Sequence, residues 1–185
     1  MRKPWIVCFL IVGILLSGCS RKSPEAAPDD GCLTLGTSLE VAPMEGWVLQ
    51  RNEDVLAAEG MYYAQWTSGE EATYKSEDGT QITAHGGEIH LVIVESEDPD
   101  VLQTNARQWI ALTQERYPEA ESKKSEFAGQ SYTVDTYQTG YARCASATGV
   151  REGLALRVDV TVLSGFQQEP GDLLEAFLNS LHYVS

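Results

Sequence analysis

The amino-terminal segment limits the fold more than any other feature of the sequence, because it holds an apolar run that a globular core does not use. Arg2 and Lys3 precede an almost wholly apolar run of 12 residues, 5–16. A membrane-spanning helix needs about 20 apolar residues, whereas the core of a secretory signal needs about 7–15. We therefore expect residues 1–18 to be a signal peptide and the fold to be built from the rest of the chain.

The residues that close this run resemble the lipobox of bacterial lipoproteins. They read Leu16-Ser17-Gly18-Cys19. In that family the chain is cut before the cysteine, so the resemblance implies that Cys19 becomes the first residue and carries acyl chains, such as palmitate, on its sulfur and amine. Several acyl chains anchor a protein stably, whereas one chain does so only marginally. The alternative is an ordinary cleaved signal followed by a chance cysteine.

Residues 19–30 predict a lipidated N-terminus followed by a flexible linker. The stretch 20–30 holds two prolines, five charged residues and no large apolar side chain. Such a segment cannot bury enough apolar surface to offset the entropy lost on ordering. The lipid would hold the protein in the cell envelope, on the extracytoplasmic side of the plasma membrane or of an outer membrane.

The acidic charge of the chain argues against nucleic acids as partners and against direct binding to anionic membrane surfaces. The whole sequence has a net charge of −14, and loss of Arg2 and Lys3 with the signal leaves 11 basic against 27 acidic residues, a net charge of −16. A nucleic-acid partner is not expected, because no basic stripe is present to neutralise phosphates. Anionic headgroups repel so acidic a domain, so the lipid and not a charged face must hold it at the membrane.

Residues 31–185 predict a single α+β domain, in which one antiparallel β-sheet carries about two helices. Helix signals are clear at Asp98-Pro99, an N-cap acceptor followed by proline in the first turn, and again near Pro170. The alternation of apolar and polar residues over 154–163 indicates a strand with one face in the core. The expected strands are 32–41, 61–67, 72–76, 81–84, 88–95, 130–139, 141–148 and 154–163.

Four short patterns in this domain are similar to those of the PsbP-like fold. They are Pro43-x-x-Gly46-Trp47, the helix at 98–117, Phe127-Ala128-Gly129, and the closing Leu174-x-x-Phe177-Leu178-x-Ser180-Leu181. The resemblance implies an antiparallel sheet with helices packed on it. Members of that family mostly bind other proteins or assist assembly, so the resemblance implies a binding or assembly module whose ligand it does not identify.

Two cysteines remain in the domain once Cys8 leaves with the signal and Cys19 is assigned to lipid. Cys32 and Cys144 are candidates for a disulfide, because an exported domain meets an oxidising compartment. In the chain-entropy model, closing so long a loop contributes roughly 4–5 kcal/mol. Two unpaired thiols are the alternative.

Known catalytic and metal-binding motifs do not occur in the sequence, so we expect no cofactor and assign no catalytic or metal-binding residue. His85, Glu88 and His90 are the best metal ligands that the sequence offers, and the alternative is that the histidines pack as neutral side chains. A cluster of acidic residues could bind calcium, and the alternative is that helix capping and solvation account for it: Glu95, Glu97, Asp98 and Asp100. A set of aromatic residues could line a ligand groove, and the alternative is that they pack within the sheet: Tyr62, Trp66, Tyr74, Tyr132, Tyr137 and Tyr141.

Two classes of function follow. The first is a membrane-anchored module without catalytic activity that binds a protein of the cell envelope or assists assembly. The second is an exported hydrolase or metal-dependent enzyme whose residues converge from distant segments, with His85, Glu88, His90 and Asp159 as its ingredients. A pocket that brings two or more of these four side chains within bonding reach would favour the enzyme.

Overall fold

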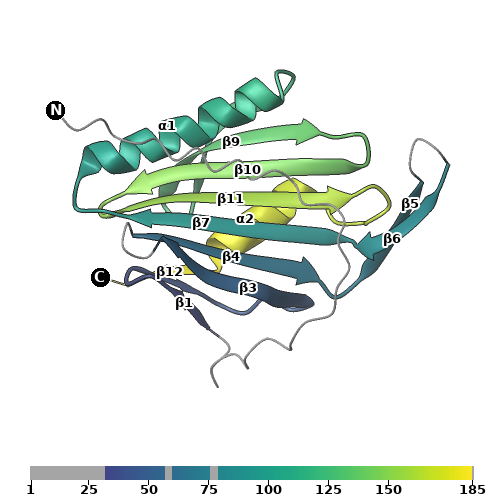
Figure 1. Cartoon of the computed structure of the whole chain (residues 1–185), viewed down its shortest axis with the longest axis horizontal. Coiled ribbons are helices and arrows are strands. Elements are labelled where there is room, and N and C mark those ends of the chain that lie inside the picture. The colour runs from purple at the N-terminus through teal and green to yellow at the C-terminus, as the bar shows by residue number, and fades with distance from the viewer. Residues whose placement is uncertain (1–31, 57–59, 76–78, 185) are drawn as a thin grey trace.

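The chain folds as an α+β domain around a seven-stranded antiparallel sheet, as expected from the sequence (Figure 1). The structure is a computed structural model and describes residues 32–56, 60–75 and 79–184. The predicted signal peptide, the lipobox at Leu16-Ser17-Gly18-Cys19 and the linker lie outside the described residues. Among those that are described, no helix has both the length and the apolar character that a membrane crossing requires.

The large sheet has the strand order β3-β4-β7-β11-β10-β9-β8, and every neighbouring pair is antiparallel. The long strands β7, β11 and β10 therefore lie in its middle, where both faces can be covered. The bounds of its strands are β3 Trp47–Leu56, β4 Met61–Ser68, β7 Gly87–Glu95, β8 Glu121–Phe127, β9 Gln130–Gln138, β10 Ala142–Arg151 and β11 Leu154–Leu163.

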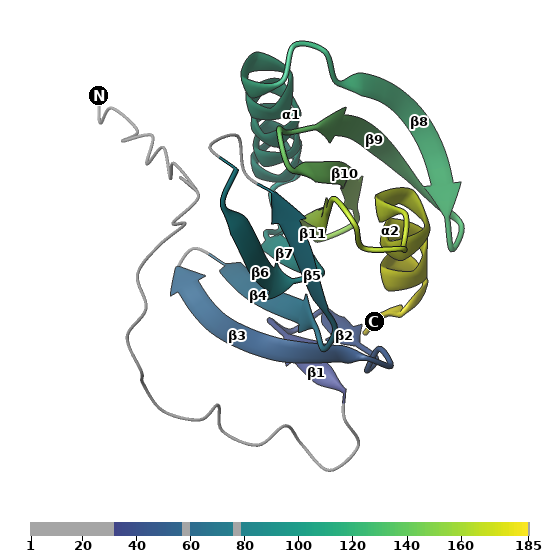
Figure 2. The ribbon, with the colours of Figure 1, turned by 90° about the vertical axis from the view of Figure 1, so that its right-hand side faces the viewer.

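Two helices cover opposite faces of the strand pair β10–β11, as the view along the sheet in Figure 2 shows. They are α1 (Pro99–Arg116) and α2 (Pro170–Asn179). Two small sheets complete the fold: β1-β2-β12 and the hairpin β5-β6. Their bounds are β1 Leu33–Leu35, β2 Leu39–Val41, β12 Leu181–Tyr183, β5 Glu71–Lys75 and β6 Gln81–His85.

The start of α1 follows from its first residues. The side chain of Asp98 accepts a hydrogen bond from the backbone N–H of Asp100 at 2.9 Å, and Pro99 occupies the first turn, where its missing N–H costs nothing. The expected apolar stripe is only partly buried. Leu102 and Ala106 are buried with Thr113, whereas Val101 is 40% exposed. Helix α1 therefore contacts the sheet with few apolar side chains.

The face that α2 covers holds the main apolar core. Leu173, Leu174, Phe177 and Leu178 of α2 pack on the alternate residues of β11 that the sequence predicted to be apolar. Gly149 of β10 belongs to the same core, since a methyl group there would lie 2.6 Å from the ring of Tyr132. This face is mainly apolar, and the hydroxyl of Tyr132 on it is hydrogen-bonded to the hydroxyl of Tyr183 at 3.0 Å.

Four segments differ from the expectation. The strand predicted at 32–41 is two strands, β1 and β2, separated by a turn at Gly36, whose φ is +60°. The final helix was expected to include Leu181 and to be followed by a tail at 182–184, but Leu181–Tyr183 form β12. The strands β3 and β8 were missed because both run along the edges of the sheet and carry many charged residues, so neither shows a clear apolar alternation.

Strand β7 lies near the middle of the large sheet, but it is not buried on both faces. Its residues alternate between buried and half-buried positions up to Ile93, because α1 covers β10 and β11 and leaves most of β7 open on that face (Figure 1). The strands expected at 72–76 and 81–84 form a hairpin, in which β5 and β6 pair from Glu71–His85 to Lys75–Gln81. Residues 76–78 of its turn lie outside the described residues.

Candidate functional site

The face of the large sheet that carries α1 is polar, in contrast to the face beneath α2. Strand register places five polar residues in one line across five strands: Gln65, His90, Asp159, Ser146 and Asp135. We call these five residues the polar row. Residues that face each other in neighbouring strands share a face and lie close together, so the row is continuous. Asp135 and Ser146 are fully buried, whereas His90 and Gln65 are half-buried on the uncovered part of the sheet.

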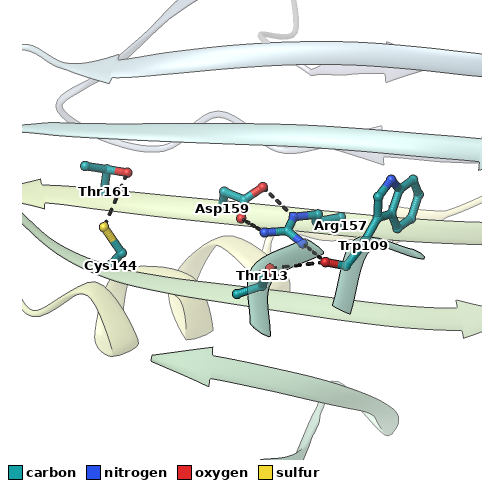
Figure 3. A network of polar contacts seen from close by, with 6 residues as sticks. All are labelled: Trp109, Thr113, Cys144, Arg157, Asp159 and Thr161. Atoms are coloured by element: carbon teal, nitrogen blue, oxygen red, sulfur yellow. Dashed lines mark hydrogen bonds and ion pairs between the residues drawn. The ribbon is translucent and has the colours of Figure 1, made fainter. Parts of the chain in front are cut away.

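Arg157 joins this face of the sheet to α1 (Figure 3). Its guanidinium donates two hydrogen bonds to the carboxylate of Asp159, Nε to Oδ2 at 2.7 Å and Nη2 to Oδ1 at 2.5 Å. Its third nitrogen, Nη1, donates to the backbone carbonyl of Trp109 in α1 at 2.8 Å. Burial opposes the charge of Arg157, but the attraction of Asp159 and of other nearby groups prevails and raises the pKa of the guanidinium. The guanidinium therefore keeps its charge and links α1 to the sheet.

His90 is the centre of a second group on the uncovered part of the face. Its Nδ1 lies 2.7 Å from the hydroxyl of Tyr63, and its Nε2 lies 3.2 Å from Oε2 of Glu88. Tyr63 also donates to Oε1 of Gln65 at 3.2 Å. The hydrogen bond from His90 lowers the pKa of Glu88, while burial opposes this effect. The result is an ordered chain of hydroxyl, imidazole and carboxylate that solvent can reach.

The structure brings only part of the predicted enzyme ingredients together. Glu88 and His90 are in hydrogen-bond contact, and Asp159 is the register partner of His90, but its carboxylate is engaged by Arg157. His85 points elsewhere, since its Nδ1 donates to the backbone carbonyl of Ser68 at 3.0 Å. Within the described parts of the chain, no three His, Cys, Asp or Glu side chains are grouped as a metal site.

The two cysteines of the domain lie in different parts of the structure. Cys32 directly precedes β1, whereas Cys144 lies in β10, with its thiol 3.9 Å from Oγ1 of Thr161 on the polar face (Figure 3). Leu35 of β1 packs in the core beneath α2, on the opposite face of the large sheet. Burial raises the pKa of the Cys144 thiol, so it stays protonated. The structure holds no disulfide between these two described cysteines, and their pairing stays a prediction.

The aromatic residues weighed as a groove do not line one surface. Trp66 is 7% exposed and packs edge-on against Phe177 in the α2 core, where Tyr132 is also buried. Tyr137 stacks on Tyr117 at the end of α1, with ring centroids 4.0 Å apart. Sheet packing therefore accounts for Trp66 and Tyr132.

The acidic residues weighed as a calcium site make structural contacts. The carboxylate of Glu95 accepts hydrogen bonds from the backbone N–H groups of Thr37 and Ser38, both at 2.8 Å, and so closes the turn between β1 and β2. Asp98 caps α1, as the sequence predicted. Glu97 and Asp100 are exposed. Capping and solvation thus account for this cluster.

Several residues of this face have roles that the sequence did not indicate. Arg157, Tyr63 and Asp135 were placed in expected strands but were given no role. The i, i+2 spacing of Glu88 and His90 identified that contact, because alternate residues of a strand share a face. The other contacts join strands far apart in the sequence, and only the register of the sheet reveals them.

No protein-family model matches the sequence, and no curated protein matches it. The structure is similar to the solution structure of cyanobacterial PsbP (CyanoP) from Synechocystis sp. PCC 6803, with a TM-score of 0.49, 10% identity, and coverage of 88% of this chain and 98% of that chain. It is also similar to a crystal structure from Bacteroides thetaiotaomicron VPI-5482, with a TM-score of 0.48, 9% identity and coverage of 82% of this chain. The chain spans half of the length of that second protein.

The attachment of α1 can be tested through Arg157. We expect Arg157→Lys to loosen α1, because a lysine cannot donate to both Asp159 oxygens and to the Trp109 carbonyl in one rigid arrangement. Hydrogen exchange measured by mass spectrometry should become at least about tenfold faster over residues 101–116, while α2 keeps its protection. Equal acceleration in both helices would mean that Arg157 supports the whole fold and not α1 in particular.

The lowered pKa of Glu88 predicts a pH dependence of stability. Because the pKa is lower in the folded state than in the unfolded state, ionised Glu88 stabilises the fold above its unfolded pKa, and this contribution is lost as the pH falls through the lower, folded pKa. The free energy of unfolding of the wild type should therefore exceed that of Glu88→Gln by a steady amount above the unfolded pKa of Glu88, with a difference that shrinks as the pH falls below about 4.5. Urea unfolding at each pH measures the difference, with Glu175→Gln, an exposed residue of α2, as the control. A difference that stayed constant down to about pH 3 would contradict the assignment.

Proposed function

We propose that this chain is an exported bacterial lipoprotein whose domain acts as a binding or assembly module outside the cytoplasm. Residues 1–18 would be the signal peptide, residues 19–30 the lipidated N-terminus and linker, and residues 31–185 the binding domain. Acyl chains on Cys19 would hold the domain at the plasma membrane or at an outer membrane. The motif Leu16-Ser17-Gly18-Cys19 at the end of the apolar run supports the anchor.

The uncovered part of the polar face is the observation that carries the binding function. On β4 and β7 it presents Tyr63, Gln65, Glu88, His90 and Val92, all half-buried. Hydrogen bonds hold four of these side chains in place before any partner arrives, so little rotamer entropy is lost on binding. Tyrosine and histidine offer flat apolar surface together with hydrogen-bonding groups, a combination suited to recognition of a protein surface. The partner that fits is a protein of the cell envelope.

An exported hydrolase is the second candidate, and one contact favours it. Tyr63, His90 and Glu88 form a chain of hydroxyl, imidazole and carboxylate, in which a base contacts a hydroxyl and is oriented by a third group. Loss of a hydrolytic activity in His90→Ala, in a variant that still binds its partner, would favour this candidate over the binding module.

The lipid anchor predicts a clear difference between two variants. Cells that express the wild type should incorporate an alkyne analogue of palmitate into the protein, and the protein should sediment with membranes. We expect Cys19→Ser to lose the label and to appear in the soluble extracytoplasmic fraction, because a hydroxyl does not take the thioether-linked lipid. Cys32→Ser, which leaves the lipobox intact, is the matched control. An unlabelled wild type would overturn the anchor.

The binding surface can be tested by photo-crosslinking in cells with the anchor intact. We expect a photoreactive phenylalanine in place of Val92, on the uncovered face, to yield one discrete crosslinked product. The same residue in place of Glu175, on the outer side of α2, should yield none. Mass spectrometry of the product identifies the partner. Equal patterns at both positions would contradict a binding surface on β4 and β7.

A further inference from the structure

The buried end of the polar row holds four oxygen atoms that make no hydrogen bond within the described residues. They are both carboxylate oxygens of Asp135, Oγ of Ser146 and Oγ1 of Thr148. The exposed fractions of these residues are 0%, 0% and 3%. Buried polar atoms almost always have a partner, so four such atoms in one place require an explanation.

These atoms lie in one layer between the sheet and α1. Ser146 of β10 is the register partner of Asp135 in β9, and Thr148 follows two residues later on the same face. The neighbours of these hydroxyl residues on β11 are Asp159 and Arg157. The layer thus contains one carboxylate and two hydroxyls beside an ion pair that is already formed.

The charges around Asp135 are not balanced at bonding distance. Two nitrogens of Arg157, Nε and Nη2, donate to the carboxylate of Asp159. The third, Nη1, donates to the backbone carbonyl of Trp109, so no nitrogen of Arg157 is bonded to Asp135. The ammonium of Lys124 donates to Oγ1 of Thr133 at 2.7 Å and makes no hydrogen bond to Asp135. A water molecule would satisfy the hydrogen bonds but would bring no charge. A buried carboxylate needs a positive partner as well.

We propose that Asp135, Ser146 and Thr148 bind a monovalent metal cation, sodium or potassium, between the sheet and α1. Hard cations prefer oxygen ligands, and these three side chains offer only oxygen. The charge selects a monovalent ion, because the Arg157–Asp159 pair is neutral and a divalent ion would leave an excess positive charge in a buried layer. The ion completes the layer on which α1 rests, and it does so whether or not the uncovered face binds a partner.

The test compares cations of different size at constant ionic strength. The intact chain, purified in detergent, is unfolded by heat in sodium chloride, potassium chloride or tetramethylammonium chloride. The midpoint Tm should rise with the logarithm of the concentration of the bound metal cation, by roughly 5–10 °C at one hundred times its Kd. Tetramethylammonium is too large to enter a buried layer and should give no such rise. A rise in one metal salt alone identifies sodium or potassium as the ion.

Two variants assign the effect to the site. Asp135→Asn should abolish the dependence of Tm on the metal cation, whereas Glu175→Gln, which removes one exposed carboxylate, should keep it. If Asp135→Asn does not fold, Ser146→Ala takes its place and should raise the apparent Kd on the order of tenfold. Equal Tm values in all three salts would overturn the proposal and leave a bound water or a protonated Asp135. Equal cation dependence in Asp135→Asn and the wild type would overturn it too.

Discussion

The position of α1 depends on the hydrogen bonds of Arg157. This helix is 18 residues long yet buries only Leu102, Ala106 and Thr113, so apolar packing alone fixes it weakly. The guanidinium joins the carboxylate of Asp159 on the sheet to the carbonyl of Trp109 on the helix, and both partners are hydrogen-bonded in fixed directions. A partly buried pair of this kind stabilises little over an apolar contact, but it determines one arrangement of the elements.

The two helices cover faces of the sheet that differ in polarity. Helix α2 is shorter but buries five residues, and the layer beneath it is mainly apolar. The layer beneath α1 holds carboxylates, hydroxyls and a guanidinium, and it continues past the helix onto β7 and β4, where solvent reaches His90 and Tyr63. Most buried apolar side chains thus lie on one face of the sheet, and the half-buried polar groups of β7 and β4 lie on the other.

The sequence predicted the parts of this fold that local patterns encode. The cap at Asp98, the alternation along β11 and the apolar stripe of α2 each depend on neighbours within a few residues, and each was found as predicted. Edge strands β3 and β8 were missed because their charged residues interrupt the alternation of apolar and polar side chains that indicates a strand. The contact of Glu88 with His90 was predictable from spacing, whereas the approach of Tyr63 to His90 and of Ser146 to Asp135 depends on the pairing of separate strands.

The small sheet β1-β2-β12 has a mechanical consequence for any attachment at the amino-terminal end of the domain. Strand β1 is the first described element, and three residue pairs hold it to β2, which three further pairs hold to β12 near the other end of the chain. A pulling force on the amino-terminal segment would load these few backbone hydrogen bonds before it reached the seven-stranded sheet. The side chains of Leu35, Leu39 and Val41 are buried in the main apolar core, so detaching this small sheet would also expose part of that core.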